Sequence, residues 1–280
     1  MINQNCKTKY PIVLIHGCGF RDYKKINYWG RIPKVLSDNG AEVYYGHQDS
    51  WATIEDNAQR IKQSVLEILK KTGAEKVNLI AHSKGGLDCR YMISKLGMAD
   101  MIASLTTIST PHHGSKTVEI LYNTFPKFAF KFVGIFVNGF NRIVGDKKPN
   151  FVDTCEQFTS TYSEKFNISN SDYEKVFYQS YATVMRNSLS DLIMLIPHFI
   201  VSKIDGECDG LVSAKSAKWT NFRGVIKSAN QRGISHCDSV DIRRRKLNKK
   251  QTDINISDKN IADITQLYFR IVHSLVEYGF

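Results

Sequence analysis

Short runs of apolar residues alternate along the chain with longer stretches in which apolar residues recur every three or four positions. The short runs are rich in Val, Ile, Leu and Tyr and lack strict alternation, which is typical of strands buried on both faces. These predicted strands are residues 11–16, 42–45, 77–81, 105–109, 199–203 and 225–227. The alternation predicts an α/β protein with a mostly parallel sheet of about six strands and helices on both faces.

The longer stretches have the period of amphipathic helices. The predicted helices are residues 54–71, 87–96 and 261–276. In the first of them, Ile54, Ile61 and Ile68 fall on one face, and Thr53 is placed to cap its N-terminus. The pattern therefore predicts where helices cover the sheet.

Residues 116–178 interrupt this alternation with an aromatic-rich segment between two predicted strands. Its phenylalanines include Phe125, Phe128, Phe130, Phe132, Phe136 and Phe140. The whole chain has 280 residues, a length at which one α/β domain buries a substantial core. We therefore predict a single domain over residues 1–280, with residues 116–178 as an insertion.

Ser83 stands where a predicted buried strand passes directly into a predicted helix. This strand–turn–helix context is the one that a serine nucleophile requires, because the tight turn exposes the hydroxyl. The residues two positions before and after must then be small, and they are Ala81 and Gly85. An incidental serine in such a turn is the alternative to a nucleophile.

A serine hydroxyl becomes a good nucleophile only when a neighbouring base takes its proton. In this type of fold the chain order is nucleophile, acid and histidine, and Asp209 and His236 follow Ser83 in that order. Both lie in predicted loops after strands, where open α/β sheets place their sites. The alternatives are Asp205 and Glu207 for the acid, and His82 and His112 for the base.

The oxyanion of an acyl-transfer intermediate needs two backbone N–H donors. The N–H of Lys84, at the start of a helix, is one candidate, and the N–H of Cys18, in the loop after the first strand, is the other. A nucleophilic role for the Cys18 thiol is the alternative interpretation of that loop.

The chain has a net charge of +11, and many of its basic residues are close together. This basic run consists of Arg243, Arg244, Arg245, Lys246, Lys249 and Lys250. It is either a solvated surface stretch or a surface that attracts anionic lipid headgroups. Because no nucleic-acid-binding motif accompanies it, we expect no nucleic-acid partner.

The six cysteines are scattered and form no CxxC pair, which excludes a disulfide scaffold and a structural zinc site. The first residues lack the apolar core of a signal peptide, and no apolar stretch has the length of a membrane span. We therefore expect a cytoplasmic protein without a transmembrane segment; secretion is the alternative if the chain is a trimmed mature form.

Together, five stretches resemble the bacterial triacylglycerol lipases of the Pseudomonas and Burkholderia type, and their amino-acid sequences are closest to those of clostridial members. They are YPIVLIHG at 10–17, AHSKG at 81–85, STPHHGS at 109–115, DGLVS at 209–213 and HCD at 236–238. The resemblance implies the α/β-hydrolase fold and hydrolysis of a lipid or small ester through Ser83, Asp209 and His236. It also implies that residues 116–178 form a lid over the acyl site; a cap with permanently packed aromatics is the alternative.

The same resemblance implies a structural calcium that braces the loop of the catalytic histidine, although the chemistry itself requires no cofactor. Asp191 and Asp238 match the family's calcium ligands. Ile242 stands where the family has a side-chain amide ligand, and the neighbouring Asp241 is a possible replacement.

Two other functions are compatible with these residues. An acyltransferase or thioesterase would use the same triad, because the choice of acceptor depends on the shape of the pocket. A non-catalytic module that binds membrane surfaces would use the basic run and the aromatic insertion instead.

Overall fold

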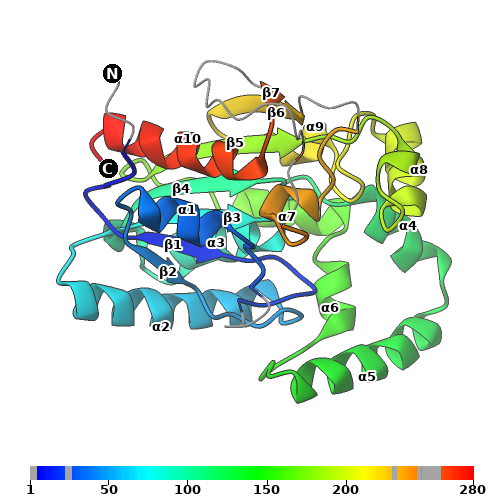
Figure 1. Cartoon of the computed structure of the whole chain (residues 1–280). Helices are drawn as coiled ribbons and strands as arrows, with labels where there is room; N and C mark the ends of the chain where they lie inside the picture. Colours follow the sequence, from blue (N-terminus) through cyan, green and yellow to red (C-terminus); the bar gives the residue numbers. More distant parts are fainter. Residues whose placement is uncertain (1–4, 23–26, 229–231, 245–246, 248–259) are drawn as a thin grey trace.

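The central sheet is parallel throughout (Figure 1). The structure is a computed structural model that describes residues 5–22, 27–228, 232–244, 247 and 260–280. Within these residues, seven strands form one sheet in the order β2-β1-β3-β4-β5-β6-β7. The strands are β1 (Ile12–Ile15), β2 (Val43–Tyr45), β3 (Val77–His82), β4 (Ile102–Ile108), β5 (Phe177–Thr183), β6 (Phe222–Ser228) and β7 (Asn260–Ile261).

Helices cover both faces of the sheet, as predicted. Those that pack against it are α1 (Ile32–Asp38), α2 (Ile54–Thr72), α3 (Lys84–Lys95) and α10 (Ile264–Glu277). Successive residues of β1 point to opposite sides. Ile12 and Leu14 pack with α1 and α10, whereas Val13 and Ile15 pack with α2 and α3. The prediction of a mostly parallel sheet between two helical layers is therefore confirmed.

The predicted strand at 199–203 is wrong, because this segment belongs to helix α8 (Leu195–Ile204). The sheet position assigned to it is taken by β5, which the hydrophobic pattern missed. β5 carries buried polar residues whose partners lie on neighbouring segments: Gln179 donates to Thr106 Oγ1 at 2.9 Å, and Ser180 Oγ donates to the carbonyl of Trp219 at 3.0 Å. Because these buried polar residues have hydrogen-bond partners, the strand is buried although its sequence is not a continuous apolar run, and a search for apolar runs misses it.

The insertion between β4 and β5 is helical. It contains α4 (Lys116–Thr124), α5 (Lys127–Ile143), α6 (Phe151–Glu156) and α7 (Ser160–Ser169). Its helices end at Ser169, and residues 177 and 178 of the predicted range already belong to β5. Figure 1 shows α5 apart from the sheet, connected at one end to α4 and at the other to α6.

Shorter elements complete the chain. They are helix α9 (Ala214–Ala217) and three 3₁₀ helices, η1 (Ala99–Met101), η2 (Ser188–Ser190) and η3 (Asp238–Val240). In the described residues, no single helix is long and apolar enough to cross a membrane. The pair α4 and α5 meets that length and composition only together, and it is bent by 117°.

Candidate active site

Ser83 occupies a strained turn between β3 and α3. Its φ of 53° lies in the left-handed region, which a residue other than glycine rarely adopts, and such strain is concentrated at functional sites. A Cβ atom added at Gly85 would lie 2.5 Å from the carbonyl oxygen of His16. The turn therefore tolerates only a very small residue two positions after Ser83, as the motif predicts.

The structure brings together Ser83, His236 and Asp209 from three separate loops. His236 Nε2 lies 3.0 Å from Ser83 Oγ, and His236 Nδ1 lies 2.7 Å from Asp209 Oδ2. Ser83 and His236 are each 8% exposed, and Asp209 is fully buried. Both distances are those of hydrogen bonds, and the three groups form a continuous series from hydroxyl to carboxylate.

The acid loop and the histidine loop are also joined through their backbones. His236 N–H donates to the carbonyl oxygen of Asp209 at 2.8 Å. Asp209 Oδ1 accepts from the N–H groups of Leu211 and Val212 at 3.1 and 2.9 Å, which leaves Oδ2 for the imidazole. These bonds fix the direction in which the carboxylate faces.

The alternative acids are engaged elsewhere. Asp205 accepts a hydrogen bond from the hydroxyl of Ser213. Glu207 is exposed and lies 3.8 Å from the ammonium group of Lys227. Asp209 is the carboxylate that reaches His236.

The alternative bases are buried and occupied. His82 contacts Tyr28 Oη through Nδ1 and Ser239 Oγ through Nε2, both at 2.7 Å. Burial, together with the adjacent triad imidazole, lowers the pKa of His82 well below its usual value. His112 contacts Thr107 Oγ1 at 3.0 Å, and burial likewise lowers its pKa. Both are therefore neutral supporting residues rather than the base that contacts Ser83.

Ser239 is a residue of the site that the sequence analysis missed. Its hydroxyl contacts His82 Nε2 and donates to the carbonyl oxygen of His236, each at 2.7 Å. Tyr268 Oη donates to the carbonyl oxygen of Ser239 at 2.9 Å. Ser239 thus ties the histidine loop to β3 and α10, and its position three residues after His236 carries no distinctive sequence signal.

The loop after β1 lies directly against the nucleophile. A Cβ added at Gly17 would stand 2.7 Å from Ser83 Cβ, so the loop passes close to Ser83 at this residue. Cys18 is the next residue of the loop. Lys84 begins α3, where backbone N–H groups lack partners within the helix. Burial raises the pKa of the Cys18 thiol, the opposite of what a reactive cysteine requires.

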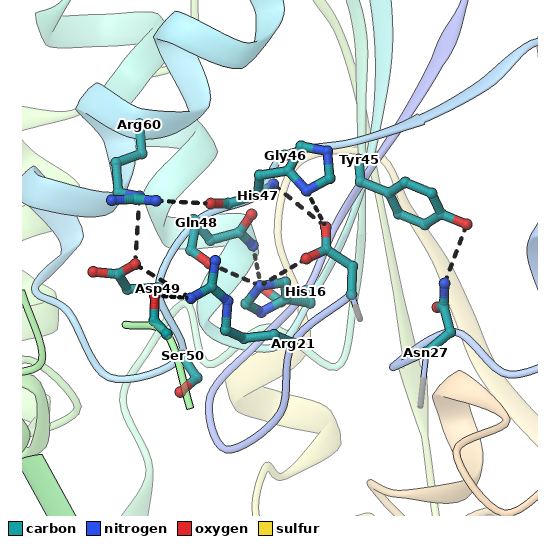
Figure 2. A network of polar contacts seen from close by, with 12 residues as sticks. His16, Arg21, Asn27, Tyr45, Gly46, His47, Gln48, Asp49, Ser50 and Arg60 are labelled. Atoms are coloured by element: carbon teal, nitrogen blue, oxygen red, sulfur yellow. Dashed lines mark hydrogen bonds and ion pairs between the residues drawn. The ribbon is translucent and has the colours of Figure 1, made fainter. Parts of the chain in front are cut away.

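A network of polar contacts holds this loop in place, and Figure 2 shows its members. Gln48 Nε2 donates to the His16 carbonyl at 2.8 Å, and His16 Nε2 lies 3.1 Å from the Gln48 carbonyl. The guanidinium groups of Arg21 and Arg60 both face the buried Asp49 carboxylate, at 3.8 and 3.4 Å. The loop that carries Cys18 is therefore fixed to the loop after β2.

Lys84 also has a side chain that the sequence analysis did not explain. Its ammonium group lies 2.6 Å from Asp88 Oδ1, and both side chains are 1% exposed. Asn57 Nδ2 donates to the other oxygen of Asp88 at 3.1 Å. Burial raises the pKa of Asp88 to about 6, although the charge and hydrogen bonds of Lys84 and Asn57 oppose this change.

The two carboxylates matched to calcium ligands do lie together, but a guanidinium group stands between them. Arg243 Nη1 and Nη2 donate to the two oxygens of Asp191 at 2.5 and 2.9 Å. Arg243 Nη1 also lies 3.4 Å from Asp238 Oδ1. The cation that these carboxylates contact is therefore an arginine side chain.

The possible replacement ligand, Asp241, is likewise bound by arginine. Arg31 donates to it through Nε at 2.8 Å and Nη2 at 2.6 Å. Ile242 is partly buried against the core. Among the residues that the structure describes, no group of three His, Cys, Asp or Glu side chains is arranged to hold a metal. These residues do not fit the calcium site that the resemblance implies.

Only part of the basic run lies in the described residues. Arg243 is directed at Asp191, and Arg244 is exposed. The remaining members, Arg245, Lys246, Lys249 and Lys250, lie outside the described residues. The two interpretations of this run, a solvated stretch or a lipid-attracting surface, therefore stay predictions.

Two segments of the chain expose several apolar side chains each. α5 exposes Phe128, Phe132, Ile135, Phe136, Phe140 and Ile143. The segment through α8 exposes Leu189, Leu192, Ile193, Ile196, Phe199 and Ile204. α4 contacts α8, and all three helices lie on one side of the molecule (Figure 1). A groove of about 280 Å³ between α4, α5 and α6 is lined entirely by apolar residues such as Phe125 and Phe130.

Sequence comparisons identify relatives over most of the chain. Residues 11–188 match the family model described as palmitoyl protein thioesterase. The chain is 30% identical over 271 residues to triacylglycerol lipase 2 of Saccharomyces cerevisiae, covering 91% of this chain and 75% of the yeast protein. It is 37% identical over 121 residues to a triacylglycerol lipase of Vibrio cholerae, covering 43% of this chain and 38% of that protein.

Solved structures show the same fold. Staphylococcus hyicus lipase has a TM-score of 0.65 at 17% identity, covering 97% of this chain and 98% of that one. A mature lipase of Bacillus licheniformis has a TM-score of 0.61 at 20% identity, covering 82% and 86%. The chain thus belongs to the α/β-hydrolase family that holds the triacylglycerol lipases and palmitoyl protein thioesterases, and it is a serine ester hydrolase.

Proposed function

We propose that the chain hydrolyses acylglycerol esters through an acyl-enzyme on Ser83. The observation that carries this proposal is the buried series of hydrogen-bond distances from Ser83 Oγ through His236 to Asp209, 3.0 and 2.7 Å long. The names of the yeast and Vibrio relatives supply the substrate class.

In the first half of the reaction, Ser83 Oγ attacks the ester carbonyl carbon while His236 Nε2 takes the hydroxyl proton. Asp209 holds the imidazole with Nδ1–H toward itself and stabilises the imidazolium that forms. The backbone N–H groups of Cys18 and Lys84 stabilise the oxyanion. Collapse of the intermediate breaks the ester C–O bond, and the alcohol leaves with the proton from His236.

In the second half, His236 takes a proton from water, and the resulting hydroxide attacks the acyl carbon. A second oxyanion intermediate forms at the same backbone donors. Its collapse releases the carboxylic acid and returns the proton to Ser83 Oγ. The chemistry uses only side chains and backbone groups of this chain.

The insertion is proposed to act as a lid that contacts a lipid interface. Lids of this kind move to expose or cover an active site. Support comes from the row of exposed phenylalanines on α5 and the exposed apolar residues of α8, since clustered exposed apolar side chains are typical of interaction surfaces. A permanently closed cap would bury these side chains.

A series of esters from p-nitrophenyl butyrate to p-nitrophenyl palmitate, followed by emulsified triacylglycerols, tests this function. We expect activity to rise with acyl length and to increase further when the substrate forms an interface. The variant Ser83→Ala is the control for the triad. Activity limited to short soluble esters would contradict the lipase assignment, and full activity in the variant would contradict the mechanism.

A thioesterase is the second candidate, because residues 11–188 match the palmitoyl protein thioesterase model. The same triad would attack a thioester carbonyl, with a thiol as the leaving group. Comparing kcat/KM for palmitoyl esters of an alcohol and of a thiol, each corrected for its uncatalysed rate, separates the two candidates. Product analysis with water and an alcohol in competition also detects an acyltransferase.

A further inference from the structure

We propose that the guanidinium of Arg243 braces the loop of the catalytic histidine in the position where related lipases use a calcium ion. The proposal rests on the role of His236 proposed above. Arg243 is then a positioning residue, and the enzyme is stable and active without calcium.

The contacts of Arg243 cross-link two segments that are distant in sequence. Asp191 precedes α8, where its Oδ1 accepts the N–H of Ile193 at 3.1 Å and its carbonyl accepts the N–H of Met194 at 3.1 Å. Arg243 follows η3, in the same loop as His236. Its two donors engage both oxygens of Asp191 in a fork, the strongest geometry for an arginine–carboxylate pair.

Asp238 extends this brace toward His236. It begins η3 two residues after His236, its N–H donates to Ser235 Oγ at 3.2 Å, and its carboxylate lies 3.4 Å from Arg243. The side chains of Asp191 and Asp238 are only 3% and 5% exposed, whereas that of Arg243 is 24% exposed. Two nearly buried carboxylates of like charge need a cation between them, and Arg243 supplies it.

A calcium ion and this guanidinium exclude each other. Calcium binds carboxylate oxygens at about 2.3–2.6 Å. Arg243 nitrogens already lie 2.5 and 2.9 Å from both oxygens of Asp191, so the metal would have to occupy the same space.

A second arginine–carboxylate contact holds Asp241, the residue directly after η3. Arg31 donates to both oxygens of Asp241 and, through Nη1, to Asp263 Oδ2 at 2.7 Å, joining the loop to α1 and α10. Two arginine–carboxylate contacts therefore hold η3 and the residues that directly follow it. This second brace uses the carboxylate that would otherwise replace the missing calcium ligand.

The first experiment uses the unaltered protein. After dialysis against EDTA and then buffer, we expect no retained calcium by elemental analysis and the same Tm with and without added calcium. Calcium that is retained at one ion per chain, or that raises Tm, would overturn the proposal. This readout does not depend on activity, so it separates failure of the brace from failure of the proposed ester hydrolysis.

The second experiment removes the guanidinium with Arg243→Ala, using Arg244→Ala as the matched control because Arg244 is the exposed neighbour. We expect kcat of Arg243→Ala to fall about 10- to 100-fold with little change in KM, because the brace orients His236 rather than the substrate. Guanidinium ions at a concentration that leaves the control unaffected should restore part of kcat.

A variant that keeps full kcat, or whose loss is the same in Arg244→Ala, would contradict a positioning role. A loss of kcat that guanidinium ions do not relieve would also contradict it. Arg243→Lys keeps the charge without the fork, and we expect its kcat to lie between those of the wild type and the alanine variant. If Arg243→Ala does not fold, this milder variant and the calcium measurements still decide the proposal.

Discussion

The helices α3 and α5 differ in which kinds of residue they bury. α3 follows the nucleophile, and nine of its 12 residues are buried, including the charged Lys84, Asp88 and Arg90. α5, whose 17 residues are all described, buries only Gly134 and Asn141 although it is rich in phenylalanine. The difference shows that burial here does not follow polarity: α3 encloses charged groups beside Ser83, whereas α5 leaves apolar side chains on the surface.

The two regions also differ in how they are attached. The catalytic loops are tied to each other along their length, as in the bond from His236 N–H to the Asp209 carbonyl. α5 is held by side chains along its length. Asn141 Oδ1 accepts from Ser50 Oγ and Asn138 Oδ1 accepts from the N–H of Phe151, each at 2.9 Å, and the ring of Phe130 stacks on that of Phe151. The loops of Asp209 and His236 are thus joined through their backbones, whereas α5 is held through its side chains.

The largest expected effect is at the nucleophile. Ser83→Ala removes the attacking oxygen, and we expect kcat/KM on p-nitrophenyl esters to fall by at least about 10⁴-fold. Tm should stay close to that of the wild type, because the Ser83 hydroxyl takes part in no buried ion pair such as that of Lys84 with Asp88. Asp205→Asn is the control and should keep wild-type activity; an equal loss there would place the acid role at Asp205.

The next largest effect concerns the buried charges of α3. Lys84→Met leaves Asp88 without its cation, and we expect the free energy of unfolding to fall by about 3–5 kcal/mol in urea denaturation. The double variant Lys84→Met/Asp88→Leu removes both charges and should recover most of this loss. A single variant as stable as the wild type would show that the ion pair of Lys84 and Asp88 does not stabilise the region around the turn at Ser83.

The double variant Phe132→Ser/Phe136→Ser tests whether the exposed apolar side chains of α5 contact a lipid interface. The two side chains are 61% and 64% exposed. We expect activity on emulsified long-chain esters to fall about tenfold, which corresponds to about 1.4 kcal/mol of lost interfacial binding. Activity on soluble p-nitrophenyl butyrate should not change. Equal losses on both substrates would favour a cap whose aromatics support the fold.

The last prediction concerns the pH dependence of stability at Asp88. Its pKa is raised to about 6 in the folded protein, above the usual value near 3.8, so the folded state holds the proton over this interval and the unfolded state does not. Stability from this group is therefore present below about pH 4 and declines as the pH rises toward 6. Relative to Asp88→Asn, the wild type should lose stability over this interval; a parallel dependence would contradict the raised pKa.

The local pattern of the chain predicted most of the sheet and the tight turn at Ser83. The buried runs predicted five of the strands, because strands covered by helices on both faces need nearly continuous apolar sequence. Ser83 could be singled out because its tight turn limits Ala81 and Gly85 to small residues. Such constraints act over a few neighbouring positions, so they leave a readable signal.

Other features of the fold and the site depend on contacts between distant segments, and only the tertiary structure decided them. The carboxylate that reaches His236 could be distinguished from Asp205 and Glu207 only once their separate partners were known. The polar strand β5 was missed and the apolar helix α8 was predicted as a strand, because burial depends on neighbours from elsewhere in the chain. Arg243 lies 52 residues beyond Asp191, and its use as the cation there follows from the folded geometry rather than from any local motif.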